Sequence, residues 1–287
     1  KDWAVLLIED LLEDGFFMSI VSNGSVLPER LLENPRCKKG AAQFTLEVSM
    51  DGLLGVHEAT RKDFATVLNS FVKILDSGIT TCVHTTVHRH NLKHMLDFSI
   101  FLNSLGEEHG TRILHTVQPL VRHPEQPDEQ IEPLRVPLRE YLEEGWRVLQ
   151  YCKQFLPWVS SRWRFISDVE NFRRYRSGIT LESALFGCTT GVAIDLRANG
   201  DVLSCEMGHP LANIRQIADR ELLAKFLEKL QRHLAPRKRC LHCKYKIVCG
   251  MCRLSPLVHG YVPGFGHKRC QDFFSDVIAF HEEMIPL

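Results

Sequence analysis

The chain has 287 residues, of which 44% are hydrophobic and 24% charged, as in ordinary soluble globular proteins. Lys plus Arg and Asp plus Glu number 35 each, so no net charge favours nucleic acid or an anionic membrane as a partner. No apolar run is long enough to span a bilayer and no signal peptide opens the sequence. We therefore expect a cytoplasmic protein whose thiols stay reduced and available to metal.

Helical and extended patterns alternate along the first part of the chain. A helix that carries Trp3 and Leu11 on its apolar face opens it, with Gly15 as its expected cap. The apolar runs predict strands at 16–21, 44–50, 79–87 and 112–118. The helical spacing predicts helices at 27–33, from Phe64 to a cap at Gly78, at 92–105 with Gly106 as the stop, and at 138–155.

This alternation is typical of βα units that build a parallel sheet, so we expect an α/β fold. Four prolines in 122–137 predict a linker or surface loop there. We place a domain boundary near Pro157, which divides the chain into a barrel-like domain at 1–157 and a cysteine-rich domain at 158–287. Four strands are fewer than a closed barrel needs, so we also expect N-terminal βα units to be missing.

Seven of the ten cysteines lie in the last hundred residues, at Cys188, Cys205, Cys240, Cys243, Cys249, Cys252 and Cys270. The first two flank a hairpin that turns at Asn199-Gly200, and four of them form two CxxC pairs. Pairs with this spacing present both sulfurs to one metal centre. A single structural zinc held by four thiolates is possible, but it leaves three cysteines without a role, so we favour iron–sulfur clusters.

Several segments together resemble a known family. Cys188, eleven residues, Gly200, four residues and Cys205, followed by the cysteines from 240 to 270, resemble the SPASM domain of radical SAM enzymes, although one gap in the run is two residues instead of three. Asn23 with its neighbours 22–24 resembles the family's Thr-Asn-Gly segment. Residues 48–52 with His57 and Arg61, and residues 85–87 with Asn91, resemble two further strand ends of the family.

The resemblance implies a partial (β/α)6 TIM-like barrel that lacks its first two βα units, followed by the SPASM domain. The absent units would carry the three-cysteine motif for the SAM-cleaving cluster and a Gly-Gly-Glu-Pro segment. Two auxiliary [4Fe-4S] clusters are implied in the chain itself. The resemblance assigns Cys188, Cys205 and Cys252 to the first, and Cys240, Cys243, Cys249 and Cys270 to the second. S-adenosyl-L-methionine and a third [4Fe-4S] cluster belong to the full-length protein.

The resemblance also suggests site residues. Ser22, Asn23, Ser49 and Arg61 match positions near SAM, and the fork of an arginine suits a carboxylate, although a surface salt bridge would also explain Arg61. Glu206 follows Cys205 where some relatives carry a catalytic aspartate; a hydrogen-bonding role at a strand end is the alternative. Cys152 is either a fourth ligand of the first cluster or a core residue. For the cluster of His84, His88, His90 and His94 we expect a rim of solvated histidines at the strand end rather than a metal site.

The function implied is that of a radical SAM/SPASM maturase, an oxidoreductase that modifies a peptide or protein by thioether or carbon crosslinking, epimerisation, or oxidation of Cys or Ser. Its partners would be that substrate and a reductant such as flavodoxin or ferredoxin. The sequence does not select among these reactions, and the chain alone is expected to be inactive. The alternatives are a zinc-stabilised non-catalytic binding module and a degenerate member that only transfers electrons.

Overall fold

A computed structural model describes residues 2–15, 18–25, 29–38, 44–120, 128–167, 169, 195–196, 199–203, 210–213, 215, 221, 224–225, 228, 244 and 267–284. The chain forms two compact units. The first comprises Lys1–Leu120 and Leu134–Arg164, and the second comprises Val121–Pro133 and Phe165–Leu287. In the described residues, no helix is both long and apolar enough to cross a membrane.

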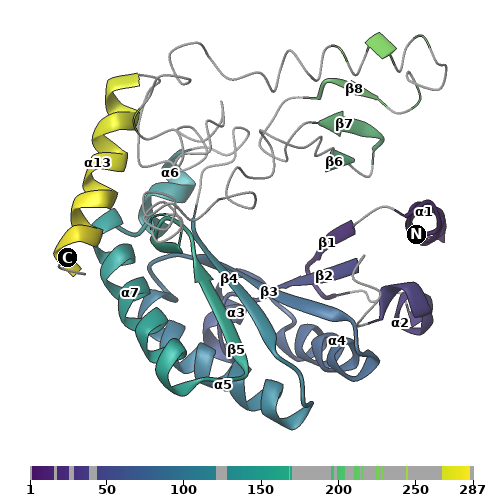
Figure 1. The fold of residues 1–287 in the computed structure, drawn as a ribbon, viewed down its shortest axis with the longest axis horizontal. Coiled ribbons are helices and arrows are strands. Elements are labelled where there is room, and N and C mark those ends of the chain that lie inside the picture. Colours follow the sequence, from purple (N-terminus) through teal and green to yellow (C-terminus); the bar gives the residue numbers. More distant parts are fainter. Residues whose placement is uncertain are drawn as a thin grey trace. The chain divides into compact units, whose positions relative to one another are not determined.

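The first unit contains a five-stranded parallel sheet in which spatial order follows chain order (Figure 1). Its strands are β1 (Met18–Ser22), β2 (Phe44–Ser49), β3 (Thr80–Val87), β4 (Ile113–Pro119) and β5 (Val159–Trp163). Consecutive parallel strands need a crossover between them, and helices supply it here. All five strands therefore end at one edge of the sheet, which we call the carboxyl edge.

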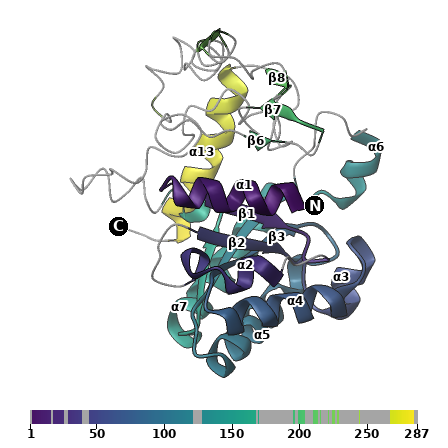
Figure 2. The ribbon, with the colours of Figure 1, turned by 90° about the vertical axis from the view of Figure 1, so that its right-hand side faces the viewer.

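The α-helices of this unit are α1 (Asp2–Glu13), α2 (Glu29–Glu33), α3 (Leu54–Thr60), α4 (Phe64–Ser77), α5 (Met95–Glu108) and α7 (Leu138–Phe155). Three short 3-10 helices accompany them: η1 (Pro35–Cys37), η2 (Leu92–His94) and η3 (Glu132–Leu134). The residues of η3 are divided between the two units. Helices α4, α5 and α7 contact β3, β4 and β5 from one face of the sheet (Figures 1 and 2). Helices α1 and α2 lie near β1 and β2.

Strand burial alternates because successive side chains point to opposite faces. In β4, Ile113, His115 and Val117 are fully buried toward the helices, whereas Leu114 is 40% exposed on the opposite face. The fully buried Phe71 of α4 and Phe98 of α5 belong to the same core. One face of the sheet is thus packed on helices, and the other carries polar and partly exposed residues such as Thr86 and Gln118.

The structure confirms the α/β fold and the predicted strands β1 to β4, each to within two residues at the ends that are described. Helix α7 has its predicted bounds, and Gly78 ends α4 with φ +74°. Gly106 does not stop α5, which continues to Glu108. That glycine is required by packing: a Cβ there would lie 2.8 Å from the Thr111 carbonyl oxygen and 2.9 Å from Trp158 Cβ.

Several elements were not predicted from the sequence, among them helix α3 (Leu54–Thr60). Strand β5 has the sequence Val-Ser-Ser-Arg-Trp, which is too short and too polar to signal a strand, yet it pairs with β4. Residues 128–134, within the expected linker, form helix α6 (Asp128–Ile131) and the turn η3. The domain boundary near Pro157 stays a prediction, and the first unit runs a few residues past it.

The second unit contains a small antiparallel sheet of β6 (Asp195–Leu196), β7 (Asp201–Leu203) and β8 (Ala212–Asn213). The hairpin predicted at Asn199-Gly200 joins β6 and β7, with Gly200 at φ +88°. Helix α13 (His267–Met284) was not predicted; its Phe273 ring packs edge-on against Phe165, with centroids 5.2 Å apart. The cysteines expected to bind clusters lie outside the described residues, except the backbone of Cys270 in α13.

Candidate functional site

The carboxyl edge gathers several polar residues from separate parts of the sequence. Ser22 ends β1, Ser49 ends β2 and is paired in register with His84 of β3, and Asp51 follows β2 by two residues. In parallel α/β sheets, ligands bind outside the carboxyl ends of the strands, because the connecting loops diverge there. The carboxyl edge is therefore the candidate ligand-binding site, and hydrogen bonds hold several of its polar side chains.

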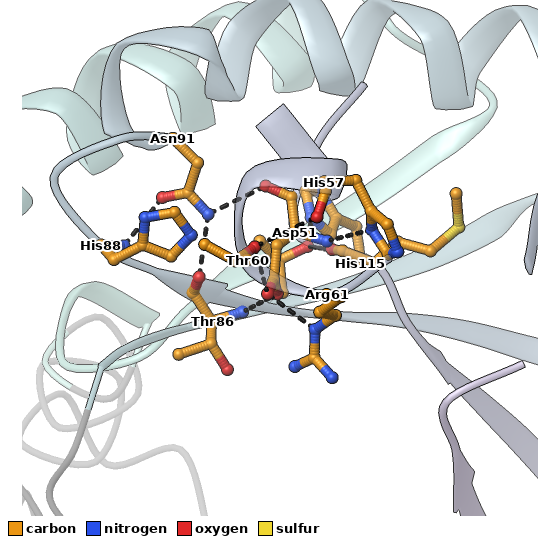
Figure 3. A network of polar contacts seen from close by, with 10 residues as sticks. Asp51, His57, Thr60, Arg61, Thr86, His88, Asn91 and His115 are labelled. Carbon is orange, nitrogen blue, oxygen red and sulfur yellow. Dashed lines mark hydrogen bonds and ion pairs between the residues drawn. The ribbon is translucent and has the colours of Figure 1, made fainter. Parts of the chain in front are cut away.

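Asp51 is the centre of a buried network (Figure 3). Its side chain is only 5% exposed. One carboxylate oxygen, Oδ1, accepts a bond of 3.1 Å from the backbone N–H of Thr86 in β3. The other, Oδ2, accepts 2.6 Å from Arg61 Nε and a long 3.5 Å contact from the Thr60 hydroxyl. The carboxylate thus ties the end of β3 to the end of α3.

The backbone of Asp51 is held as firmly as its side chain. Its N–H donates to His57 Nδ1 at 3.3 Å, and its carbonyl accepts 2.9 Å from the side-chain amide of Asn91. The same side-chain amide donates a hydrogen bond of 2.9 Å to the backbone carbonyl of Thr86. The side-chain oxygen of Asn91, Oδ1, accepts a hydrogen bond of 2.7 Å from the backbone N–H of His88. Asn91 is completely buried, so every one of these bonds replaces a bond to water.

Arg61 lies at the C-cap of α3, where its side chain is 34% exposed. Only its Nε contacts Asp51, and Figure 3 shows the two Nη nitrogens directed away from that carboxylate. The backbone that follows is strained, because the non-glycine residues Lys62 and Asp63 have φ of +119° and +57°. The Glu58 carboxylate accepts the Phe64 N–H at 2.7 Å and fixes the start of α4 after this turn.

Three buried histidines surround the network, and their partners define their tautomers. His57 Nδ1 accepts from Asp51 N–H, and His88 Nδ1 accepts from His90 N–H, so in each neutral ring the proton is on Nε2. The Thr85 hydroxyl donates 2.6 Å to the Met50 carbonyl and therefore accepts from His115 Nε2 at 3.0 Å. The rings of His88 and His115 each keep one buried nitrogen without a partner among the described residues.

Burial sets the charge state of these rings. Desolvation lowers the pKa of His57 and of His88, although the Asp51 carboxylate opposes it in both cases. Desolvation lowers the pKa of the fully buried His115 to about 3. All three imidazoles are therefore neutral near pH 7, and Arg61 is the positive charge that faces Asp51.

The loop after β1 is a tight turn with few contacts of its own. The Ser22 hydroxyl accepts a hydrogen bond of 3.1 Å from the backbone N–H of Gly24. The side-chain oxygen of Asn23, Oδ1, accepts a hydrogen bond of 3.1 Å from the backbone N–H of Ser25. Gly24 has φ +73°, and a Cβ there would lie 2.9 Å from Val67 Cγ1. Asn23 is exposed, so its side chain remains accessible at the carboxyl edge.

The structure confirms the expectation of solvated histidines for the exposed His90 and His94, and corrects it for His84 and His88. His88 is only 3% exposed, and His84 has a carboxylate partner, with Nδ1 at 3.6 Å from Glu47 Oε2. Interaction with His84 is the main cause that lowers the pKa of Glu47. Among the residues that the structure describes, no group of three or more potential metal ligands is found.

The predicted SAM-contact residues thus come from the same edge of one sheet: Ser22 and Asn23 after β1, Ser49 at the end of β2, and Arg61 at the end of α3. A hydroxyl, an amide and a guanidinium suit the polar groups and carboxylate of an amino-acid ligand. Glu206 lies outside the described residues. Cys152 is buried in α7, and desolvation raises the pKa of its thiol, which favours its interpretation as a core residue.

Sequence reasoning missed the role of His115 and the central role of Asp51. His115 alternates with the apolar residues Ile113 and Val117, which is the signal of a buried face. Asp51 lies in the segment 48–52 that resembles the family, but it was assigned no role of its own. Its function as a hub depends on Thr86 and Asn91, which are 35 and 40 residues away.

Comparison with known proteins yields structural neighbours only. No family model and no curated protein matches the sequence. Native anSMEcpe with bound AdoMet and Cp18Cys peptide matches with a TM-score of 0.57 at 17% identity, over 94% of this chain and 77% of that one. Streptococcus suis SuiB matches with a TM-score of 0.56 at 13% identity, over 84% of this chain and 56% of SuiB.

Further structures contain SuiB with S-adenosylmethionine and SuiB with its precursor peptide SuiA, the latter matching with a TM-score of 0.53 over 81% of this chain. At such identities the likeness shows a shared α/β fold with a parallel sheet. This chain spans little more than half the length of SuiB.

Proposed function

We propose that this chain belongs to a radical SAM enzyme that modifies a peptide or protein. The observation that carries the proposal is the fixed position of Arg61, held by Asp51 at the carboxyl edge of the sheet, where β1 and β2 also end. The structural neighbours anSMEcpe and SuiB bind S-adenosylmethionine and peptides. S-adenosylmethionine and a peptide are also the ligands that the resemblance of the sequence to the radical SAM family implies.

In this proposal SAM binds across the carboxyl edge. The Ser49 hydroxyl donates a hydrogen bond to SAM, and Arg61 binds the SAM carboxylate. Ser22 and Asn23 line the site at the end of β1. The residues fit such a ligand, because Arg61 remains partly exposed and its Nη nitrogens are not used by Asp51. When bound, SAM and its cluster would supply a carbon radical that takes a hydrogen atom from the substrate.

Cys188, Cys205 and Cys252 would hold one auxiliary cluster, and Cys240, Cys243, Cys249 and Cys270 the other, since thiolates are the usual ligands of four-iron clusters. The hairpin of β6 and β7 supports this assignment, because it reverses the chain between Cys188 and Cys205. Glu206, next to Cys205, would accept a proton from the substrate radical. The bond that the enzyme makes is not assigned.

The SAM site is tested by measuring ligand affinity. The full-length protein, reconstituted anaerobically, should bind SAM, and Arg61→Ala should weaken binding at least roughly tenfold, because a charge-assisted pair is lost. Arg36→Ala is a matched control, since Arg36 lies in η1 with an exposed side chain. Unchanged SAM affinity in Arg61→Ala would contradict the assigned role of this residue.

A further inference from the structure

A second group of buried polar atoms lies away from the carboxyl edge, on the face of β4 and β5 that packs on helices. His115 of β4 is paired in register with Ser161 of β5, and residues paired in this way on neighbouring parallel strands point to the same face. His115 is fully buried, and Ser161 alternates with the buried Val159 and Trp163. Helices α5 and α7, which both contact β5, cover this face (Figure 1).

The hydrogen bonding on this face is incomplete. His115 Nε2 donates to Thr85, which leaves His115 Nδ1 as an acceptor. Neither that nitrogen nor the Ser161 hydroxyl oxygen has a hydrogen-bond partner among the residues that the structure describes, and both atoms are shielded from solvent. The same is true of Trp163 Nε1, two residues further along β5. Polar groups buried this deeply are bonded in nearly all folded proteins, either to protein or to an internal water.

The spacing of the two strands suits one water molecule. Neighbouring strands lie about 4.8 Å apart, and a water bridges atoms at such a separation through two hydrogen bonds of about 2.8 Å each. Serine is the smallest side chain on this face of β5, so it leaves room beside the imidazole of His115. The donors and acceptors also match, because a water can donate to His115 Nδ1 while its oxygen accepts from the Ser161 hydroxyl.

We propose that His115 Nδ1 and Ser161 Oγ form a binding site for one internal water molecule between the sheet and helices α5 and α7. This water ends a buried chain of hydrogen bonds. His115 Nε2 donates 3.0 Å to the Thr85 hydroxyl, whose own proton goes to the Met50 carbonyl at 2.6 Å. That direction requires an unprotonated Nδ1, and a water that donates to Nδ1 stabilises this tautomer. The site thus supports the backbone directly before Asp51.

Valine and threonine in place of Ser161 form a matched pair of variants. Both are β-branched and similar in size, but only Ser161→Thr keeps the hydroxyl. If the water is bound, Ser161→Val should have a folding equilibrium constant roughly tenfold lower than Ser161→Thr, because the water loses a partner or is displaced by a methyl group. If the site is dry, valine instead removes an unpaired buried hydroxyl, and Ser161→Val should be the more stable variant. Urea unfolding of the full-length protein measures both constants, and an equal or reversed order would overturn the inference.

A crystal structure of the wild-type protein gives an independent result, which stands even if neither variant folds. We expect one ordered water within hydrogen-bond distance of both His115 Nδ1 and Ser161 Oγ. A direct bond between these two side chains, an apolar atom packed against Nδ1, or no ordered water at this place would each contradict the proposal. All of these outcomes leave the proposed function unaffected, because the water site lies away from the residues assigned to SAM.

Discussion

A single aspartate organises the carboxyl edge of this sheet. Asp51 receives bonds at both carboxylate oxygens, at its carbonyl and, through its N–H, at His57. Its ionic partner Arg61 is one-third exposed, so the pair alone contributes little to stability. The pair acts mainly by positioning: it fixes a guanidinium whose two Nη nitrogens face away from Asp51.

His115 is the residue at which burial has its largest electrostatic effect. The ring is fully buried against Phe98, with centroids 5.5 Å apart, and has a single bond, to Thr85. Its pKa is lowered to about 3, whereas an unfolded histidine titrates near 6.5. The unfolded chain therefore takes up a proton first as the pH falls.

This difference predicts a loss of stability in acid. The contribution of His115 is fully present above pH ~6.5 and is lost as the pH falls toward about 3, by an amount on the order of 5 kcal/mol. His115→Gln removes the titration and keeps a donor for Thr85. Its free energy of unfolding, measured by urea denaturation from pH 7 to 4, should fall less steeply than that of wild type.

His94→Gln is the control for this measurement, because His94 is exposed in η2. Its pH dependence should match that of wild type. If His115→Gln loses stability with falling pH as steeply as wild type, His115 is not the buried neutral base described here.

At the scale of elements, α5 is held against the sheet by a close approach of backbones. Gly106 is buried in the last turn of α5, and a Cβ there would lie 2.8 Å from the Thr111 carbonyl and 3.0 Å from the Trp158 carbonyl. The obstructing atoms are backbone atoms, which cannot move as a flexible side chain does. This position therefore requires glycine for packing and not for its backbone conformation.

Gly106→Ala should accordingly destabilise the protein by about 1–3 kcal/mol, since overpacking forces a backbone shift. Gly55→Ala is the matched control: Gly55 also lies in a helix, α3, but its Cβ would meet no atom within 4 Å. Alanine there should be neutral or stabilise by up to roughly 1 kcal/mol. Thermal unfolding of both variants checks the pair, and an equally stable Gly106→Ala would contradict the packing argument.

Elements with strong local patterns were predictable, and elements defined by tertiary pairing were not. The apolar stripe of α4 with its Gly78 cap, and the apolar runs of β2 and β3, encode their structure locally. Strand β5 contains the polar residues Ser160, Ser161 and Arg162, and it forms because its backbone pairs with β4. Gly106 gave a misleading stop signal, because a packing requirement produces the same residue as a helix cap.

At the scale of the whole molecule, the candidate site could be predicted in its members but not in its connections. Resemblance to a family selected Ser49, Arg61 and Asn91 as separate short motifs. That Asp51 joins Arg61 to Thr86 follows from the fold, which brings the ends of β2, β3 and α3 together. No local pattern contains such long-range contacts, so no reading of one segment reveals them.

We propose that the protein is an iron–sulfur enzyme of the radical SAM type, and metal analysis tests this directly. The protein should be purified and reconstituted without oxygen, and its iron, sulfide and zinc measured per chain. The seven cysteines from Cys188 to Cys270 predict two four-iron clusters, with about eight irons and as many sulfides. One zinc per chain with no iron would contradict this proposal and indicate a zinc-stabilised binding module.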